Sequence, residues 1–249
     1  MQICDSLALV ASMQFGISGP LDCHVYAIRA PEGIVLIDAG GGTHTACVLA
    51  NLARDFPESP VKAVVLTHCH LDHCGGAASM KEMTGCQIIA PEPSRKIVET
   101  ADEEGSGLRV AREQGIYPAD FRMRACPVQR GIQDAEDFAV AGQQFRAIHV
   151  RGHSLDSFCY LTTAAGMNWL FAGDILFYGG LLGLINAAGS GMEGYRQDLR
   201  KLGGLAVEGL FPGHGLFTLC GGQRHVDHAI EQLNCGFLGR QIGQWDFIF

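Results

Sequence analysis

The chain has 249 residues, of which 47% are hydrophobic and 18% charged, and its formal net charge is −8 at pH 7. This length and composition fit one folded domain and argue against a disordered chain. The acidic balance argues against nucleic acid as a partner, because nucleic-acid binders usually present a basic face.

No segment suggests a membrane partner. The longest apolar stretches, such as Gly179 to Ala188, are too short and too rich in glycine to cross a bilayer, and the N-terminus lacks a basic start followed by an apolar block. We therefore expect a cytoplasmic protein. Its ten cysteines form no Cys-x-x-Cys pair, so we expect reduced thiols.

The first third of the chain alternates strand and helix patterns. Cys23 to Ile28 and Gly33 to Ile37 are predicted strands, and Thr43 to Phe56 has the apolar spacing of a helix. Lys62 to Leu66 is a short apolar run that predicts a buried strand. It ends at Thr67, so we expect the next residues to form a loop at the carboxyl end of that strand, where active-site loops lie in α/β sheets.

The rest of the chain predicts a helical insertion followed by a β-rich half. Residues 92–121 are polar and largely helical in pattern, with a break at Tyr117-Pro118, and no linker isolates them. The predicted strands are Phe138 to Val140, Gln144 to Val150, Phe158 to Thr162 and Trp169 to Ala172, and the predicted helices are Met192 to Leu202 and Gln223 to Asn234. We expect one domain over residues 1–249, with the helical insertion at about 92–121 and two β-rich halves covered by helices.

One short segment carries most of the chemical information. Residues 67–76 read Thr-His-Cys-His-Leu-Asp-His-Cys-Gly-Gly, which places His68, His70, Asp72 and His73 in a single predicted loop. Imidazole and carboxylate groups suit zinc, iron, manganese or nickel, and side chains one residue apart on an irregular loop can converge. The segment therefore predicts a metal site that needs further ligands from elsewhere.

Three later residues are candidates for those ligands. His153, Asp174 and His214 each follow a predicted strand and lie beside a glycine, where a close approach of backbones is possible. Each alone is typical of an ordinary turn, but their joint occurrence after the first motif favours one shared site. By contrast, His225 and His228 lie on a predicted helix beside Asp227 and Arg224, which favours a solvated helical face.

The order of these residues resembles the metallo-β-lactamase superfamily, over about Cys23 to Gly215. In that family a His-x-His-x-Asp-His motif precedes a lone histidine, a bridging aspartate and a last histidine. The resemblance implies an α/β fold, a four-layer αββα sandwich of two mixed β-sheets flanked by helices. It implies one ion held by His68, His70 and His153, a second held by Asp72, His73 and His214, and Asp174 bridging the two.

The resemblance also implies the chemistry. We expect two divalent metal ions as cofactors, with zinc as the first candidate and iron or manganese as alternatives. A metal-bridging hydroxide would attack a carbonyl ester-type bond of a small-molecule substrate, and Asp72 would help to pass a proton to the leaving group. Asp38 matches the family's aspartate that hydrogen-bonds to a ligand and would orient it without binding metal.

A bridging Asp174 resembles glyoxalase II thioesterases and acyl-homoserine lactonases and is unlike the true β-lactamases. The first prediction is a lactone or other ester as substrate, because Tyr178 resembles the phenol that follows the bridging aspartate in the lactonases and could donate to the developing oxyanion. A pocket-wall role for Tyr178 is the alternative. A glyoxalase II-like thioesterase is the second interpretation, although the region after His214 offers only Arg224 and Arg240 to grip glutathione.

Two questions stay open at the level of sequence. A mononuclear iron persulfide dioxygenase is the third interpretation, although redox relatives that carry a diiron centre usually have glutamate where this chain has His70. The aromatic tail, Trp245 to Phe249, fits either a homodimer contact or the closure of the chain's own core.

Overall fold

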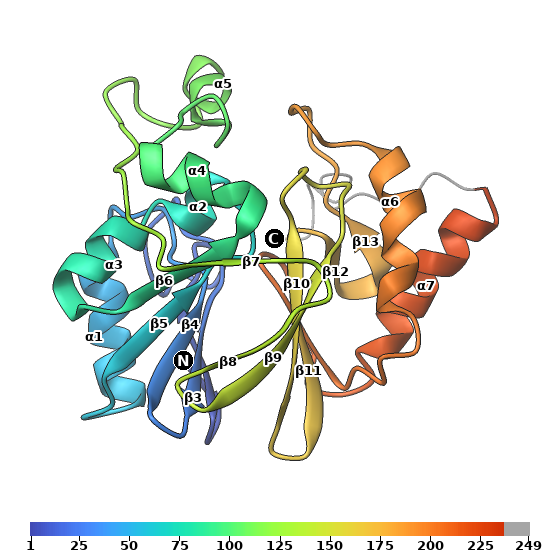
Figure 1. The fold of residues 1–249 in the computed structure, drawn as a ribbon, viewed down its shortest axis with the longest axis horizontal. Helices are drawn as coiled ribbons and strands as arrows, with labels where there is room; N and C mark the ends of the chain where they lie inside the picture. The colour runs from blue at the N-terminus through green and yellow to red at the C-terminus, as the bar shows by residue number, and fades with distance from the viewer. Residues whose placement is uncertain (237–249) are drawn as a thin grey trace. The chain divides into compact units, whose positions relative to one another are not determined.

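The computed structural model describes residues 1–236, and the chain divides into two compact units. The N-terminal unit comprises Met1–Ile132 and Ala139–Gln143, and the C-terminal unit comprises Gln133–Phe138 and the chain from Gln144 onward. Each unit contains a mixed β-sheet and flanking helices (Figure 1), which confirms the predicted α/β class. A single domain over residues 1–249 stays a prediction, and the tail from Trp245 lies outside the described residues.

The N-terminal unit has a seven-stranded sheet whose strands follow chain order. They are β1 (Gln2–Cys4), β2 (Leu7–Ala11), β3 (Val25–Ala30), β4 (Gly33–Ile37), β5 (Val61–Val65), β6 (Gln87–Pro91) and β7 (Arg130–Ile132). Strands β1 to β4 pair antiparallel, whereas β4 to β7 pair parallel. The parallel strands therefore end at one edge of the sheet, and the segment that begins at Thr67 leaves that edge directly after β5.

Helices cover one face of this sheet. Helices α1 (Thr45–Asp55) and α3 (Ala77–Thr84) contribute to one apolar cluster that also contains Leu36 of β4 and Val64 of β5. The alternate residues of these strands are also buried. Burial on both faces explains why these strands read in the sequence as continuous apolar runs without alternation.

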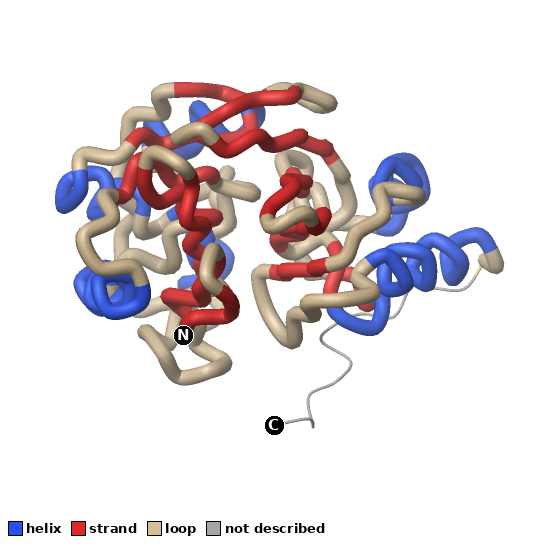
Figure 2. Tube along the Cα trace, turned by 90° about the horizontal axis from the view of Figure 1, so that it is seen from below, coloured by secondary structure: helices blue, strands red, loops and turns tan. Residues whose placement is uncertain are grey.

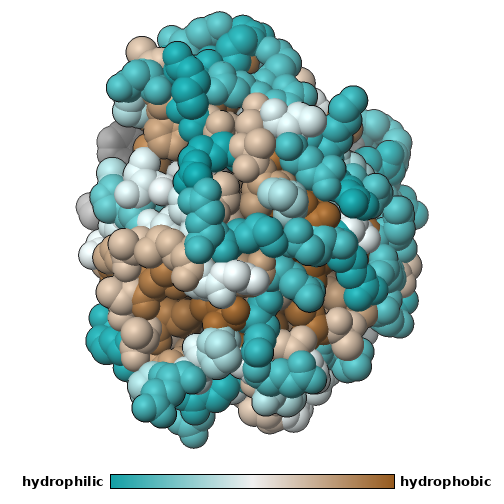
Figure 3. All heavy atoms as spheres, turned by 60° about the vertical axis from the view of Figure 1, so that its left-hand side comes forward, coloured by the Kyte–Doolittle hydropathy of each residue, from teal (hydrophilic) through white to brown (hydrophobic). Residues whose placement is uncertain are grey.

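The predicted insertion is helical only in part. Helix α4 spans Glu92–Thr100 and α5 spans Leu108–Glu113, and no helix follows before residue 130. Arg109 pairs with Glu104 and Glu113, and the surface around α5, at the top of Figure 3, is largely hydrophilic. Val98, Leu108 and Tyr117 are buried in this segment, whereas Ile116 is exposed.

The C-terminal unit has a five-stranded sheet in the order β14-β11-β10-β9-β8. The strands are β8 (Asp137–Val140), β9 (Gln143–His149), β10 (Phe158–Ala164), β11 (Met167–Gly173) and β14 (Gly209–Pro212). Strand β14 pairs parallel to β11, and β10 pairs antiparallel to β9 and β11. The carboxyl ends of β11 and β14 therefore meet at the same edge.

Two helices cover this second sheet. Helix α6 (Met192–Asp198) continues into the short 3-10 helix η2 (Leu199–Leu202), and α7 spans Gln223–Asn234. Both α6 and α7 lie on the same side of the sheet (Figures 1 and 2), and their apolar residues share a core with β9, β10 and β11. The bounds of α7 are those predicted from the sequence.

In the part of the chain that the structure describes, no helix is long and apolar enough to cross a membrane.

Candidate metal centre

The histidine motif begins where β5 ends and is only partly a loop. His68 and His70 lie in an irregular segment, whereas Asp72 and His73 lie on the one-turn helix α2 (Leu71–Cys74). The expectation of a loop throughout is therefore wrong for the second half of the motif. Leu71 and Cys74 are buried in the core of the N-terminal unit, and this burial fixes the turn.

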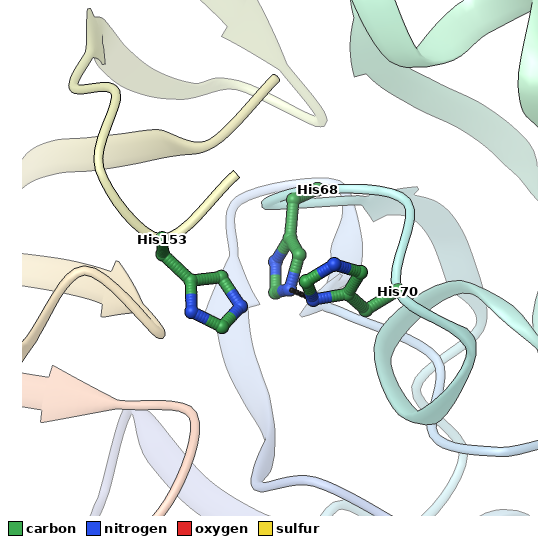
Figure 4. Close-up of side chains that lie close together, drawn as sticks. All are labelled: His68, His70 and His153. Carbon is green, nitrogen blue, oxygen red and sulfur yellow. Dashed lines mark hydrogen bonds between the residues drawn. The ribbon is translucent and has the colours of Figure 1, made fainter. Parts of the chain in front are cut away.

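Within the N-terminal unit, the donor atoms of the motif lie close together in pairs. His68 Nε2 is 3.0 Å from His70 Nδ1, and this contact is the dashed line in Figure 4. Asp72 Oδ2 is 3.4 Å from His73 Nε2. Two ligands at bond lengths of about 2.1 Å on one tetrahedral ion lie roughly 3.4 Å apart, so these separations suit metal ligands.

A single buried carboxylate, Asp38, orients this motif. Its Oδ1 accepts the backbone N–H of Thr67 at 2.7 Å, and its Oδ2 accepts the Thr67 hydroxyl at 2.9 Å and His73 Nδ1 at 2.8 Å. Asp38 has a φ of 65°, a left-handed conformation that aspartate tolerates better than most residues. The sequence reasoning that placed Asp38 beside a ligand therefore identified a residue that contacts His73 directly.

These hydrogen bonds also assign the ring protons. Because Asp38 is an acceptor, His73 carries its proton on Nδ1 and presents the lone pair of Nε2. The Thr67 hydroxyl donates its hydrogen to Asp38, so it accepts a hydrogen bond from His68 Nδ1 at 2.9 Å. His68 therefore also keeps a lone pair on Nε2. Asp38 thus prepares two imidazoles for metal binding, one directly and one through Thr67.

Cys23 also lies in this cluster, and its Sγ is within 4.8 Å of donor atoms of Asp38 and His73. Burial raises the pKa of the Cys23 thiol well above its ordinary value. The neutral thiol is therefore favoured beside Asp38, in keeping with a packing role.

In the C-terminal unit, the three later candidates gather around one carboxylate oxygen. Asp174 Oδ2 is 3.7 Å from His153 Nε2 and 3.4 Å from His214 Nε2. His153 follows β9, Asp174 follows the last residue of β11, and His214 follows β14 with one residue between. Strand ends thus bring together residues that are 61 positions apart in the sequence.

A backbone carbonyl orients His153 in the same way as Asp38 orients His73. His153 Nδ1 donates to the carbonyl oxygen of Gly183 at 2.7 Å, so its Nε2 carries the lone pair. His153 is the third ring drawn in Figure 4. A Cβ at Gly183 would lie 1.8 Å from the backbone oxygen of Asp174, so only glycine fits at this position.

Tyr195 of α6 connects the segments that carry these donors. Its buried hydroxyl accepts the N–H of Gly183 at 3.2 Å and donates to the carbonyl of Ile175 at 3.0 Å. Its ring packs under Gly152, where a Cβ would lie 2.3 Å from the ring. One side chain therefore contacts the residues next to His153 and Asp174 and the residue that orients His153.

A charged cluster holds the His153 turn from the other end. Arg151 Nε donates to Asp198 Oδ2 at 2.6 Å, and Lys201 Nζ lies 3.1 Å from Asp198 Oδ1. Burial alone would raise the pKa of Asp198, but the hydrogen bonds from Arg151 and Lys201 outweigh it and lower the pKa to about 2. Asp198 is therefore an anion at neutral pH that ties the His153 turn to α6.

Tyr178 lies on a 3-10 turn, η1 (Tyr178–Gly180), four residues after Asp174. Its side chain is half-exposed, and its hydroxyl forms no hydrogen bond with any residue the structure describes. Its ring lies 4.3 Å from the ring of His225, whose Nδ1 accepts the N–H of Gly179 at 3.0 Å. His225 is buried and its pKa is lowered by that burial, so the expected solvated face is wrong at His225.

Apart from Asp38, the sequence patterns missed the residues that orient the donors. Thr67 directly precedes the motif, and Gly183 lies in a glycine-rich loop, so both had a weak signal in the sequence. Tyr195 and His225 had none, because their contacts join positions far apart in the chain.

Donors of this kind, oriented at the strand ends of an α/β fold, define a metal-dependent enzyme. A family model described as the metallo-beta-lactamase superfamily matches residues 18–214. The chain belongs to this superfamily of metal-dependent hydrolases.

Individual relatives are informative about chemistry. Atrochrysone carboxyl ACP thioesterase of Aspergillus fumigatus is 31% identical over 193 residues, which cover 77% of this chain and 50% of that protein. Hydroxyacylglutathione hydrolase of a Marinomonas species is 26% identical over 204 residues, which cover 80% of this chain and 63% of that protein. The chain thus spans about half the length of the Aspergillus thioesterase.

Solved structures support the fold. A metallo-beta-lactamase of Cronobacter sakazakii superimposes with a TM-score of 0.70 at 18% identity, covering 95% of this chain and 96% of that one. At this identity the likeness establishes the metallo-β-lactamase fold alone.

Replacing Asp38 with alanine should weaken metal binding. Asp38→Ala removes the acceptor that fixes the tautomers of His73 and His68, so we expect metal affinity to fall by about 10- to 100-fold. Competition with a chromophoric chelator measures this affinity. The exposed Asp120→Asn variant is the control and should bind as the wild type does, and equal affinity in both variants would contradict the role assigned to Asp38.

Removing one oxygen from Tyr195 should destabilise the C-terminal unit. Tyr195→Phe keeps the ring but leaves the N–H of Gly183 and the carbonyl of Ile175 without their partner, which should cost about 1–3 kcal/mol. Urea unfolding of metal-free protein measures the loss. Tyr178→Phe is the matched control, since its hydroxyl bonds to no described residue, and its unfolding midpoint should not move.

Proposed function

We propose that the chain is a binuclear metal-dependent hydrolase that cleaves acyl thioesters. The observation that carries the proposal is Asp174, one of whose oxygens lies within 3.7 Å of two imidazole nitrogens in the C-terminal unit. A single carboxylate oxygen between two such donors suits an aspartate that bridges two ions. Membership of the superfamily and the named thioesterase relatives support the reaction class.

All seven predicted donors take part in the proposed centre. His68, His70 and His153 would hold one ion, Asp72, His73 and His214 would hold the other, and Asp174 would bridge them. Zinc is the proposed ion, with iron or manganese as alternatives, because imidazole and carboxylate donors suit all three. We further propose a small-molecule substrate, a cytoplasmic location and no nucleic-acid or membrane partner.

The chain's own residues supply orientation and proton transfer. When bound, two divalent ions would supply a water acidic enough to ionise near neutral pH and a positive charge for the carbonyl oxygen of the substrate. Asp38, Thr67 and the carbonyl of Gly183 keep the imidazole lone pairs directed at the ions. The side chain of Asp72 is partly exposed, and its carboxylate would take up the proton of the attacking water and deliver it to the sulfur that leaves.

A lactone or other oxygen ester is the second candidate substrate, and one observation favours it. The phenol of Tyr178 is exposed and has no hydrogen-bond partner among the described residues, so it is available to donate to a carbonyl oxygen as charge develops. The sequence placed this candidate first. The named thioesterase relatives favour the thioester instead.

Metal dependence and substrate class can be measured together. We expect zinc-loaded protein to hydrolyse acyl thioesters of N-acetylcysteamine faster than the corresponding lactones, and chelation to abolish both rates. Asp174→Ala should lower kcat by at least about a thousandfold, since it removes the bridge between the ions, while circular dichroism stays unchanged. One iron per chain with oxygen uptake on glutathione persulfide would replace this proposal with a persulfide dioxygenase.

The role of Tyr178 can be tested separately with the same substrates. If its phenol stabilises the developing oxyanion, Tyr178→Phe lowers kcat by about tenfold or more with little change in KM. Rates on a lactone and a thioester of the same acyl group show which substrate depends on it. An unchanged kcat on both substrates would mean that Tyr178 has a structural role and takes no part in catalysis.

A further inference from the structure

Most exposed large hydrophobic side chains of the C-terminal unit follow a donor or Gly183 closely along the chain. In the described part of this unit they are Leu155, Tyr178, Ile185, Leu216 and Leu219. Leu155 is 64% exposed and Leu216 is 59% exposed. Water-exposed apolar side chains gathered in this way commonly mark a binding surface.

These side chains lie close to the proposed ligands along the chain. Leu155 follows His153 by two residues, and Leu216 follows His214 by two residues. Two residues span at most about 7 Å, so both leucines start within that distance of a ligand backbone. Because His153 and His214 converge on the same oxygen of Asp174, the two leucines border one cluster of donors.

Ile185 lies close to the same donors because it is near Gly183 in the chain. It follows Gly183 by two residues, and Gly183 accepts the hydrogen bond that orients His153. The loop that carries Ile185 also packs against Leu155, since a Cβ at Gly189 would lie 2.7 Å from Leu155 Cγ. Leu219 lies apart from them, because the antiparallel bridge between Thr218 and Leu210 places it toward the start of β14. We call Leu155, Ile185 and Leu216 the apolar rim.

The loops around the rim carry no charge. Residues 175–191 and 215–222 contain no lysine, arginine, aspartate or glutamate, although 18% of the whole chain is charged. The one acid on the His153 turn, Asp156, is buried and accepts a hydrogen bond from Ser154. Residues 175–191 and 215–222 therefore offer no cation to the carboxylates of glutathione, and Arg151 of the His153 turn is paired with Asp198.

We propose that the apolar rim binds the acyl chain of the substrate and makes the enzyme selective for apolar, extended acyl groups. This inference rests on the proposed hydrolase function and adds the class of acyl group. A methylene that leaves water contributes up to about 0.8 kcal/mol, or about fourfold in kcat/KM. A rim of three aliphatic side chains can cover several methylenes, whereas a short hydroxyacyl group would leave the rim exposed.

The test is a series of N-acetylcysteamine thioesters from acetyl to decanoyl. For the wild type we expect kcat/KM to rise by about two- to fourfold per methylene along the first part of the series. In the double variant Leu155→Gln with Leu216→Gln, the dependence on chain length should fall to less than half of that. Equal kcat/KM for acetyl and decanoyl thioesters in the wild type would overturn the inference while leaving the hydrolase function intact.

The matched control is Met83→Gln. Met83 is 55% exposed, like the rim leucines, but lies near the end of α3 in the N-terminal unit, ten residues after His73. This variant should keep the chain-length dependence of the wild type. Loss of that dependence in Met83→Gln would mean that general surface hydrophobicity, and not the rim, sets the selectivity, which contradicts the proposal.

If the protein hydrolyses no thioester, the proposed function is wrong. A binding measurement still tests the inference about the rim in that case. Calorimetry with S-alkyl N-acetylcysteamine thioethers of increasing length should give an affinity that rises with length in the wild type and stays flat in the double variant. Binding that is independent of length in the wild type would refute the rim. If the double variant instead changes a dimer into a monomer and keeps the chain-length dependence, the rim is an interface between copies and the proposal is wrong.

Discussion

The hydrogen bonds of one buried carboxylate control the chemistry of the N-terminal half of the site. Asp38 accepts three hydrogen bonds, two from Thr67 and one from His73, and so decides which nitrogen of two imidazoles keeps its lone pair. A histidine with the proton on the other nitrogen could not bind metal in the same orientation. The left-handed backbone at Asp38 lies directly after β4, and parallel pairing with β5 places this carboxylate beside Thr67.

In the C-terminal unit, neutral groups orient the imidazole of His153. The carbonyl of Gly183 replaces the carboxylate as the acceptor for an imidazole proton, and the hydroxyl of Tyr195 holds Gly183 in place. Neutral acceptors add no charge beside Asp174, whereas Asp38 adds one near the N-terminal donors. Both units therefore orient an imidazole by a hydrogen bond to its Nδ1. The acceptor is a carboxylate in the N-terminal unit and a backbone carbonyl in the C-terminal unit.

The sequence predicted most long elements because they have local signals, and the candidate donors of residues 68–73 stand out in the sequence for the same reason. Strand β4 and helix α7 have the predicted bounds, since an apolar run and a helical spacing are visible within a few residues. Strands β2 and β6 were missed, because short apolar segments lack a distinct period. The burial of His225 was missed because it depends on the close approach of α7 to Gly180, whose Cβ would lie 2.9 Å from the His225 carbonyl oxygen. Such contacts join distant segments and leave no local pattern.

Orientation of the donors and choice of substrate fall to different side chains of the same loops. His153 and His214 are fixed by buried neighbours, whereas Leu155 and Leu216, two residues further along, project into water. The side chains of Leu155 and Leu216 form none of the hydrogen bonds that orient His153, so a substitution there would leave the proposed metal ligand oriented. Replacement of Gly183 or Tyr195 alters the orientation of His153 itself. Substrate preference in this fold can therefore vary far more freely than the residues that hold the ligands in place.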